Sequence, residues 1–146
     1  MKLIPYGRQY IDKSDIKEVA TALTKDNITS GKITLKFEKK ISKFLNCRYS
    51  IACNSGTSAI FIALNALNLK KGDILIMPSI NFISSYNAAK ILGAKVYLAD
   101  VDRFTGQMRP EDVENCFKKF RIKNFHALVV MYNGGYPQNA EKFKLL

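Results

Sequence analysis

The stretch YSIACNSGTSAIFIALNALNL, residues 49–69, decides how the rest of the chain is interpreted. Its apolar start, residues 49–53, predicts a buried strand, and apolar residues at helical spacing from Thr57 onward predict an amphipathic helix. The turn between them suits a phosphate, because the first N–H groups of a helix have no partner within it and Gly56 lets an anion approach closely. The hydroxyl groups of Ser55, Thr57 and Ser58 add donors, although such residues are also common in turns that only cap a helix.

The rest of the chain alternates helices with apolar strands. Helices are predicted over residues 12–25, 34–46, 57–69, 86–92 and 111–120, and strands over 49–53, 74–77, 95–99 and 126–131. Strands that are apolar throughout and joined by helices are typical of a mostly parallel α/β sheet with right-handed crossovers. Ligands of such sheets bind outside the carboxyl ends of the strands. The loops at residues 54–57, 78–85 and 132–137 are therefore predicted to converge on one crevice.

Length and composition argue against several protein classes. The chain has 146 residues, 47% of them hydrophobic, which is enough for one ordinary domain, and no shift in composition marks a boundary. No apolar run could cross a bilayer and the first residues lack the core of a signal peptide, so a cytoplasmic location and no membrane partner are expected. Cys47, Cys53 and Cys116 lack metal-binding spacing, and His126, in an apolar run, is typical of a structural histidine. No metal site is predicted.

The formal net charge of +11 raises the question of a nucleic-acid partner. The lysines are scattered along predicted helices rather than packed into a run with interleaved aromatic residues, as at 36–43 and 118–123. This pattern favours solvated helix faces over a nucleic-acid site, and no nucleic-acid partner is predicted. The basic excess could still attract a phosphorylated small molecule in a non-specific way.

Several motifs occur in an order that matches one enzyme family. They are IPYGRQYID (residues 4–12), the stretch 28–38 that begins ITSGK, NSGTSA (54–59), KKGDILIMPSINF (70–82), GAKVYLADVD (93–102) and GGYP (134–137). Together they resemble the DegT/StrS family of pyridoxal-phosphate (PLP)-dependent nucleotide-sugar aminotransferases over essentially the whole chain. Within that family they are most similar to the UDP-4-amino-4,6-dideoxy-N-acetyl-altrosamine transaminases.

The resemblance implies the large domain of PLP fold type I. Residues 1–146 would form the N-terminal segment and the first half of that domain, with the rest of it and the small C-terminal domain absent. The Schiff-base lysine and the aspartate that pairs with the pyridinium nitrogen would lie beyond the C-terminus, so no catalytic residue is assigned within the chain. The chain alone is therefore expected to be inactive, and the complete enzyme is expected to be a homodimer.

The resemblance also assigns binding residues. Gly56 and Thr57, with Ser55 beside them, match the turn that holds the cofactor phosphate, and Phe82 matches the aromatic residue that stacks on the pyridine ring. The alternative for Phe82 is a core residue that anchors its loop. The residues that match regions near the nucleotide sugar are Tyr6, Arg8, Thr29, Ser30 and Gly31. The alternative for the arm around Tyr6 and Arg8 is a packing role. Residues 131–133 read Met-Tyr-Asn where many relatives have a histidine, which leaves the sugar open.

The expected function follows from this resemblance. The complete enzyme would move an amino group, expected to come from glutamate, to the keto carbon of a nucleotide-linked 4-keto-6-deoxy sugar, supplying amino sugars for surface polysaccharide. Three alternatives stay open at this point. The protein could be a PLP-fold sugar dehydratase, the non-functional product of a truncated gene, or a basic module that binds nucleotides or nucleic acid.

Overall fold

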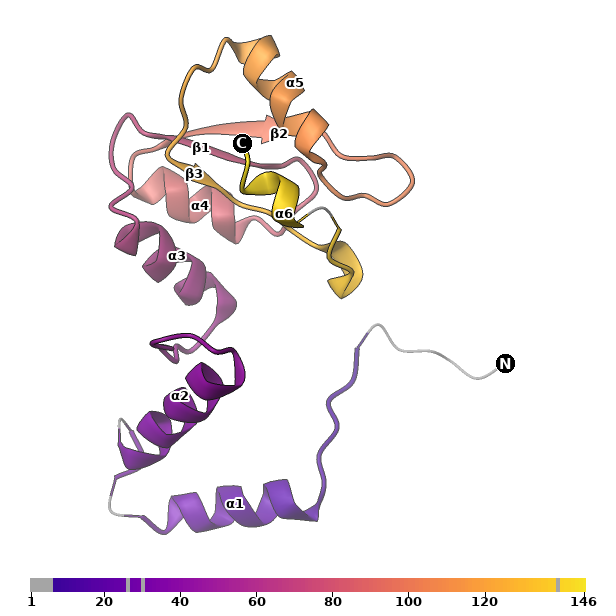
Figure 1. The fold of residues 1–146 in the computed structure, drawn as a ribbon. Coiled ribbons are helices and arrows are strands. Elements are labelled where there is room, and N and C mark those ends of the chain that lie inside the picture. The colour runs from indigo at the N-terminus through magenta and orange to yellow at the C-terminus, as the bar shows by residue number, and fades with distance from the viewer. Residues whose placement is uncertain (1–6, 26, 30, 139) are drawn as a thin grey trace. The chain divides into compact units, whose positions relative to one another are not determined.

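The computed structural model describes residues 7–25, 27–29, 31–138 and 140–146 (Figure 1). The chain divides into two compact units, Met1–Ala52 and Cys53–Leu146, and each is described by itself. Of the residues that matter for the site, Tyr6 and Ser30 lie outside the described ranges.

The first unit consists of two helices, α1 (Lys13–Leu23) and α2 (Lys32–Phe44). Helix α1 begins where the side chain of Asp12 accepts the N–H groups of Ser14 and Asp15, while the Asp15 carboxylate accepts the N–H of Asp12 at 2.9 Å. This reciprocal cap satisfies donors that a helix start otherwise leaves open. Both predicted helices are thus present, and each of their ends lies within two residues of its predicted limit.

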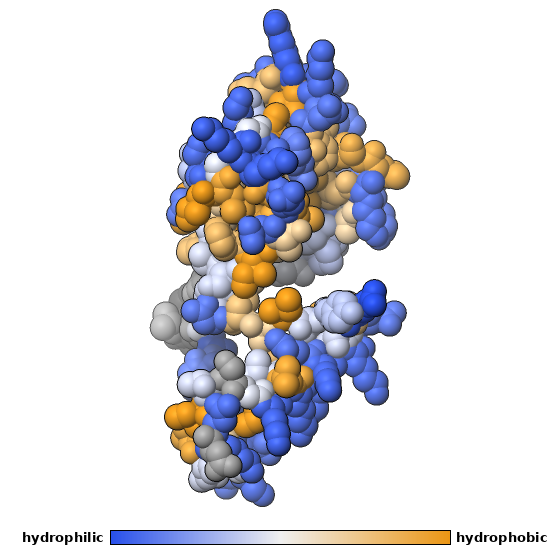
Figure 2. Space-filling view, turned by 90° about the vertical axis from the view of Figure 1, so that its left-hand side faces the viewer, coloured by the Kyte–Doolittle hydropathy of each residue, from blue (hydrophilic) through white to orange (hydrophobic). Residues whose placement is uncertain are grey.

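The first unit has no apolar core among its described residues. Neither helix contains a buried residue, and side chains on their apolar stripes are largely exposed, such as Val19 (61%), Leu23 (68%) and Phe37 (55%). Figure 2 shows hydrophobic side chains at the molecular surface on one face. The clusters of buried hydrophobic side chains come from the second unit instead.

The predicted strand at residues 49–53 is wrong. In the described part of the chain no strand runs beside this segment, and Tyr49 and Ile51 are each 72% exposed. The segment is bound to α2 instead: Ser50 Oγ donates to the backbone oxygen of Glu38 at 2.9 Å, and the Ala52 N–H donates to Glu38 Oε1 at 2.9 Å. An apolar run becomes a strand only where another strand completes its ladder of hydrogen bonds.

The second unit contains a three-stranded sheet in the order β2-β1-β3. Strand β1 (Ile74–Pro78) lies between β2 (Lys95–Ala99) and β3 (Ala127–Leu128) and is parallel to both, with Leu75 opposite Val96 and Ala127. The helices are α3 (Gly56–Ala66), α4 (Ser84–Ile91), α5 (Pro110–Phe120) and α6 (Ala140–Phe143), with a 3-10 turn at Asn133–Gly135. The predicted parallel α/β arrangement is confirmed, although β3 is shorter than the predicted strand 126–131.

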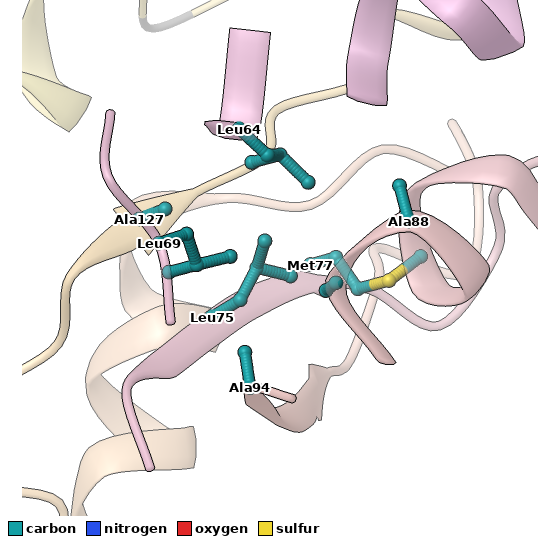
Figure 3. Close-up of a cluster of buried hydrophobic side chains, with 8 residues drawn as sticks. Leu64, Leu69, Leu75, Met77, Ala88, Ala94 and Ala127 are labelled. Carbon is teal, nitrogen blue, oxygen red and sulfur yellow. The ribbon is translucent and has the colours of Figure 1, made fainter. Parts of the chain in front are cut away.

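Alternate residues of β1 contribute to two separate apolar clusters, one on each face of the sheet. Leu75 and Met77 pack with side chains of α3 and α4, including Leu64 and Ala88 (Figure 3). On the other face the cluster of Ile76 also contains residues of β2 and α5: Ala99, Val113 and Cys116. Because both faces are covered, Leu75 and Ile76 are fully buried, which explains why β1 is apolar throughout.

His126 joins the starting ends of β1 and β3. Its Nδ1 accepts the N–H of Ile74 at 3.0 Å, and its Nε2 lies 3.2 Å from Oδ1 of Asp73. An Nδ1 that accepts a hydrogen bond carries no proton, so a neutral ring has its proton on Nε2 and donates it to Asp73. Both ring nitrogens are engaged, in keeping with the structural role predicted for this histidine.

Two kinds of feature are absent from the described residues. They contain no group of three or more side chains that could hold a metal ion. No helix within them is both long and apolar enough to span a bilayer.

Candidate cofactor and substrate site

The candidate phosphate site is the beginning of α3, in the second unit. Ser55 is the cap residue: its Oγ accepts the N–H of Ser58 at 3.1 Å, and its backbone is extended, with φ −161° and ψ 158°. Ser58 Oγ donates to Oδ1 of Asn54 at 2.7 Å. The predicted capping role of this turn is therefore present, and it occupies the hydroxyl groups of Ser55 and Ser58.

This cap leaves the first donors of the helix available. The N–H groups of Gly56 and Thr57 and the Thr57 hydroxyl have no hydrogen-bond acceptor among the described residues. A Cβ built on Gly56 would meet no other atom within 4 Å, so no side chain packs against the position where a Gly56 side chain would lie. Converging N–H groups at the positive end of a helix dipole are the usual features of a phosphate site. The turn can thus be a cap and an anion site together.

Thr57 also opens onto a groove between α3 and α4. The groove has a volume of about 410 Å³ and is lined by Thr57, Ser58, Phe61, Ile62, Asn87, Ala88 and Ile91. Its lining is mostly apolar, with the Asn87 amide as a polar group on the α4 side. Helix α4 therefore provides one wall of the space beside the α3 terminus.

Phe82 lies in the loop that follows the carboxyl end of β1, two residues before α4 begins. Its side chain is 68% exposed. The alternative of a core residue that anchors its loop is therefore wrong for this structure, because the ring is not packed in either apolar cluster. An exposed aromatic ring at the carboxyl edge of a parallel sheet leaves a flat face on which a planar ligand can stack.

The loop after β3 continues the same edge of the sheet. Residues 133–135 form a 3-10 turn in which Gly134 and Gly135 have φ of 69° and 73°, and the Gly135 N–H donates to the Tyr132 oxygen at 3.0 Å. This loop and the loop after β1 leave neighbouring parallel strands at their carboxyl ends, as predicted. The turn at residues 54–57 does not follow a strand, because the segment before it is irregular. For this turn, the prediction of a loop that leaves the carboxyl end of a strand is therefore wrong.

A network of hydrogen bonds in the loop between β2 and α5 was not predicted from the sequence. Asp102 Oδ1 accepts the N–H groups of Phe104 at 3.0 Å and Thr105 at 2.9 Å. The pKa of Asp102 is lowered below its usual value, and the largest cause is the hydrogen bond from the N–H of Thr105. Asp102 Oδ2 lies 3.4 Å from Nη1 of Arg109, which also pairs with Asp112 at 3.0 Å. Gln107 Nε2 donates to the Tyr136 oxygen at 3.1 Å and so joins this loop to the loop after β3.

Of the residues predicted to approach the sugar, the structure describes Arg8, Thr29 and Gly31. All three belong to the first unit. Arg8 is exposed in an irregular segment. The N–H and hydroxyl of Thr29 both donate to Oδ1 of Asn27, at 3.3 and 3.1 Å, and Gly31 precedes α2 as its cap residue. A pocket of about 200 Å³ in this unit is lined by Ala22, Leu23, Asn27, Ile28, Thr29, Gly31, Ile33 and Thr34.

Comparison with known proteins extends these observations. A model of the DegT/DnrJ/EryC1/StrS aminotransferase family matches residues 9–141. Among solved structures, a protein described as a sugar aminotransferase from Streptococcus pneumoniae, in its PLP form, is 26% identical with a TM-score of 0.71. That match covers 77% of this chain and 29% of the other.

Two further structures match nearly the whole chain. An aminotransferase from Psychrobacter cryohalolentis is 24% identical with a TM-score of 0.81, and the match covers 97% of this chain and 35% of the other. A GDP-4-keto-6-deoxymannose-3-dehydratase is 21% identical with a TM-score of 0.84, covering 97% of this chain and 37% of the other. At these identities the two matches establish the fold. The chain thus spans about a third of the length of the structures that it resembles.

Proposed function

This chain belongs to the DegT/DnrJ/EryC1/StrS aminotransferase family, and we propose that it carries the phosphate-binding part of a PLP-dependent enzyme that aminates nucleotide-linked sugars. In this proposal, residues 1–146 are the N-terminal segment and first half of the cofactor-binding domain. The sugar class is supported by the similarity to a protein described as a sugar aminotransferase, whose structures include PLP and PMP forms.

The start of α3 is the observation that carries the proposal. Two N–H groups, of Gly56 and Thr57, and the Thr57 hydroxyl are without a protein acceptor in the described structure, and no atom packs within 4 Å of the Cβ position of Gly56. A cofactor phosphate carries negative charge, which is favoured at a helix N-terminus and which accepts hydrogen bonds from these donors. Ser55 contributes by capping the helix, because its Oγ accepts the N–H of Ser58.

Phe82 is the proposed stacking partner of the pyridine ring. When bound, the cofactor supplies an electron sink and carries the amino group, while the protein supplies binding and orientation. An exposed phenyl ring in the loop after β1 suits this role, because aromatic rings favour offset stacking and exclude water from one face of the ligand.

For the sugar substrate we propose the first-unit residues Tyr6, Arg8, Thr29, Ser30 and Gly31. The support is the exposed guanidinium of Arg8, whose planar fork matches the oxygen atoms of a diphosphate, and the polar loop before α2. The keto carbon that is aminated, the altrosamine-type sugar, glutamate as amino donor and the homodimer belong to the same proposal. Sugar dehydration is the alternative reaction to amination, because a dehydratase shares the fold.

The test is binding of pyridoxamine 5′-phosphate, which needs no Schiff-base lysine, followed through the NMR signals of the Gly56 and Thr57 amides. The variant Gly56→Pro removes one N–H while keeping the helix, because proline is favoured at the first helical position and Ser55 already has the extended conformation that precedes proline. Loss of one hydrogen bond to a charged group should weaken binding about tenfold or more.

The matched control is Ser55→Ala, which removes the cap hydroxyl but leaves both N–H groups in place. It should destabilise the start of α3 by about 1 kcal/mol and affect binding less than Gly56→Pro. Equal affinity of the wild type and Gly56→Pro, or the absence of saturable shifts at Gly56 and Thr57, would contradict the proposal.

A further inference from the structure

Gln107 connects the loops that follow the two outer strands of the sheet. It is 6% exposed, and its side-chain Nε2 donates to the backbone oxygen of Tyr136 at 3.1 Å, across 29 positions of sequence. Its own loop follows β2, whereas Tyr136 follows β3, and β1 lies between these strands. A buried glutamine amide is therefore placed so that it reaches from one edge loop to the other.

The loop that Gln107 holds would be flexible without it. Gly134 and Gly135 both have positive φ, and glycine loses more conformational freedom on ordering than any other residue. Residues 133–138 are exposed, so burial gives them little order. Within the turn itself, the Gly135 N–H donates to the oxygen of Tyr132, and the bond from Gln107 then fixes the residue at which the turn ends.

The loop on which Gln107 sits is braced on several sides. The backbone oxygen of Gln107 accepts the N–H of Asp102 at 2.9 Å, and the backbone N–H of Gln107 donates to Oγ1 of Thr105 at 3.3 Å. Asp102 in turn accepts from Thr105 and lies 3.4 Å from Nη1 of Arg109, which pairs with Asp112 on α5. The loop after β2 is held rigidly by these bonds, whereas the turn after β3 contains two glycines. The bond from Gln107 therefore lets the loop after β2 restrict the conformation of the loop after β3.

We propose that Gln107 is a positioning residue: its amide holds residues 133–136 in one conformation at the carboxyl edge of the sheet, where they can take part in ligand binding. The second half of this statement rests on the proposed function, since the loop leaves the same edge as Phe82. The first half does not depend on it. Gln107 acts through the backbone of Tyr136 and needs no contact with the ligand.

The experiment measures amide hydrogen exchange at Gly135 in the ligand-free chain. The variant Gln107→Leu fills a similar space with an apolar side chain but removes the donor. In this variant, protection of the Gly135 amide should fall about fivefold or more, the effect of one net hydrogen bond. Amides of β1 should keep their protection, which shows that the sheet remains folded. The matched control is Gln138→Leu, the same substitution at an exposed glutamine two residues after Tyr136.

A second variant keeps the test valid if Gln107→Leu does not fold. Gln107→Glu has the same length, but its ionised carboxylate has no proton to donate to the Tyr136 oxygen. Protection at Gly135 should be low at about pH 8 and recover toward about pH 5, where burial favours the protonated carboxyl. The wild type should lack this recovery. Unchanged Gly135 protection in both variants, or the same loss in Gln138→Leu, would overturn the positioning role.

Titration with pyridoxamine 5′-phosphate tests the link to the ligand. In the wild type the signals of Gly134 and Gly135 should shift together with that of Gly56, whereas in Gln107→Leu only the Gly56 shift should be retained in full. Shifts at Gly134 and Gly135 that are unaffected by Gln107→Leu would contradict that link. No shift at Gly56 in the wild type would instead reject the proposed function, and the exchange result would still decide whether Gln107 orders the loop.

Discussion

Two glycines, Gly72 in the turn before β1 and Gly93 in the turn before β2, separate the energetic cost of a left-handed backbone from the cost of a steric clash. Gly72 and Gly93 have φ of 94° and 83°, and the Gly72 N–H donates to the Gly93 oxygen. A Cβ on Gly72 would meet nothing within 4 Å, but a Cβ on Gly93 would lie 3.0 Å from Cα of Lys71. Backbone atoms of Lys71 cannot move away without shifting the turn.

Alanine at these two glycines should therefore destabilise the protein unequally. Gly72→Ala should lower the free energy of unfolding by about 1–2 kcal/mol, the cost of a left-handed conformation for a residue with a Cβ. Gly93→Ala should cost about 1–3 kcal/mol more because of the overpacking against Lys71. Urea denaturation of the two variants beside the wild type measures the difference. Equal midpoints for both variants would show that the close contact with Lys71 costs nothing.

Candidate site residues could be chosen from the sequence where they act through their immediate neighbours, but not where they act across the fold. Gly56 and Thr57 are recognisable because a helix start and its donors are set by a few adjacent residues. Thr57 was predicted as the start of the helix and Gly56 as part of the turn before it, whereas α3 begins one residue earlier, at Gly56. Gln107 was missed because its partner, Tyr136, is 29 residues away and the bond uses a backbone oxygen that any residue would offer. Only the fold brings these two residues together.

At the scale of elements, β3 is held by few interactions of its own. It pairs with β1 over two residues, and the N–H of Val129 adds a bond to the Ile76 oxygen at 2.9 Å. At its start the His126 ring bonds to the Ile74 N–H and to Asp73, which is 8% exposed. The ring thus supplies side-chain bonds where the ladder is short.

We expect His126→Ala to loosen β3 before the rest of the sheet. Loss of the ring leaves the Ile74 N–H without its acceptor and should lower the free energy of unfolding by about 1 kcal/mol. Amide exchange should accelerate at Val129 and change much less within β2. Asn124→Ala, an exposed position two residues earlier, is the control. Acceleration of equal size in β2 would mean that His126 stabilises the whole sheet and has no particular role in β3.

Predictions of elements succeeded where a helix or strand could be recognised from its own pattern. The helices α1, α2, α3 and α5 have apolar residues at helical spacing and were predicted within a few residues. The strand predicted at 49–53 was wrong because an apolar pattern does not supply a neighbouring strand, and Glu38 binds this segment instead. For the same reason the strand predicted at 126–131 is reduced to Ala127–Leu128, the part that is paired with β1.

For the whole molecule, the parallel sheet could be predicted because β1 has no polar face. Leu75 and Ile76 point to opposite faces and are both fully buried, which is possible only when helices cover both sides. The division at Ala52 into two units was not predicted, since no change in composition marks it. The two helices of the first unit contain no buried residue among those described, whereas α3, α4 and α5 of the second unit do.

The last prediction concerns the activity of these 146 residues by themselves. We expect them to bind pyridoxamine 5′-phosphate without catalysing amine transfer. The resemblance to the family implies that the lysine and the carboxylate that act on the cofactor lie outside residues 1–146. The chain spans about a third of the length of related structures. Transamination needs both groups, because one moves protons and the other keeps the pyridine ring an electron acceptor.

The measurement is the formation of 2-oxoglutarate from glutamate and PLP, with free PLP as the control and Gly56→Pro as the matched protein. The wild-type chain should produce no more 2-oxoglutarate than free PLP does, although its Gly56 and Thr57 amide signals respond to pyridoxamine 5′-phosphate. A rate clearly above that of free PLP, and reduced in Gly56→Pro, would mean that a lysine within the chain replaces the one expected elsewhere. That result would contradict the proposal that this chain binds the phosphate while residues outside it catalyse the reaction.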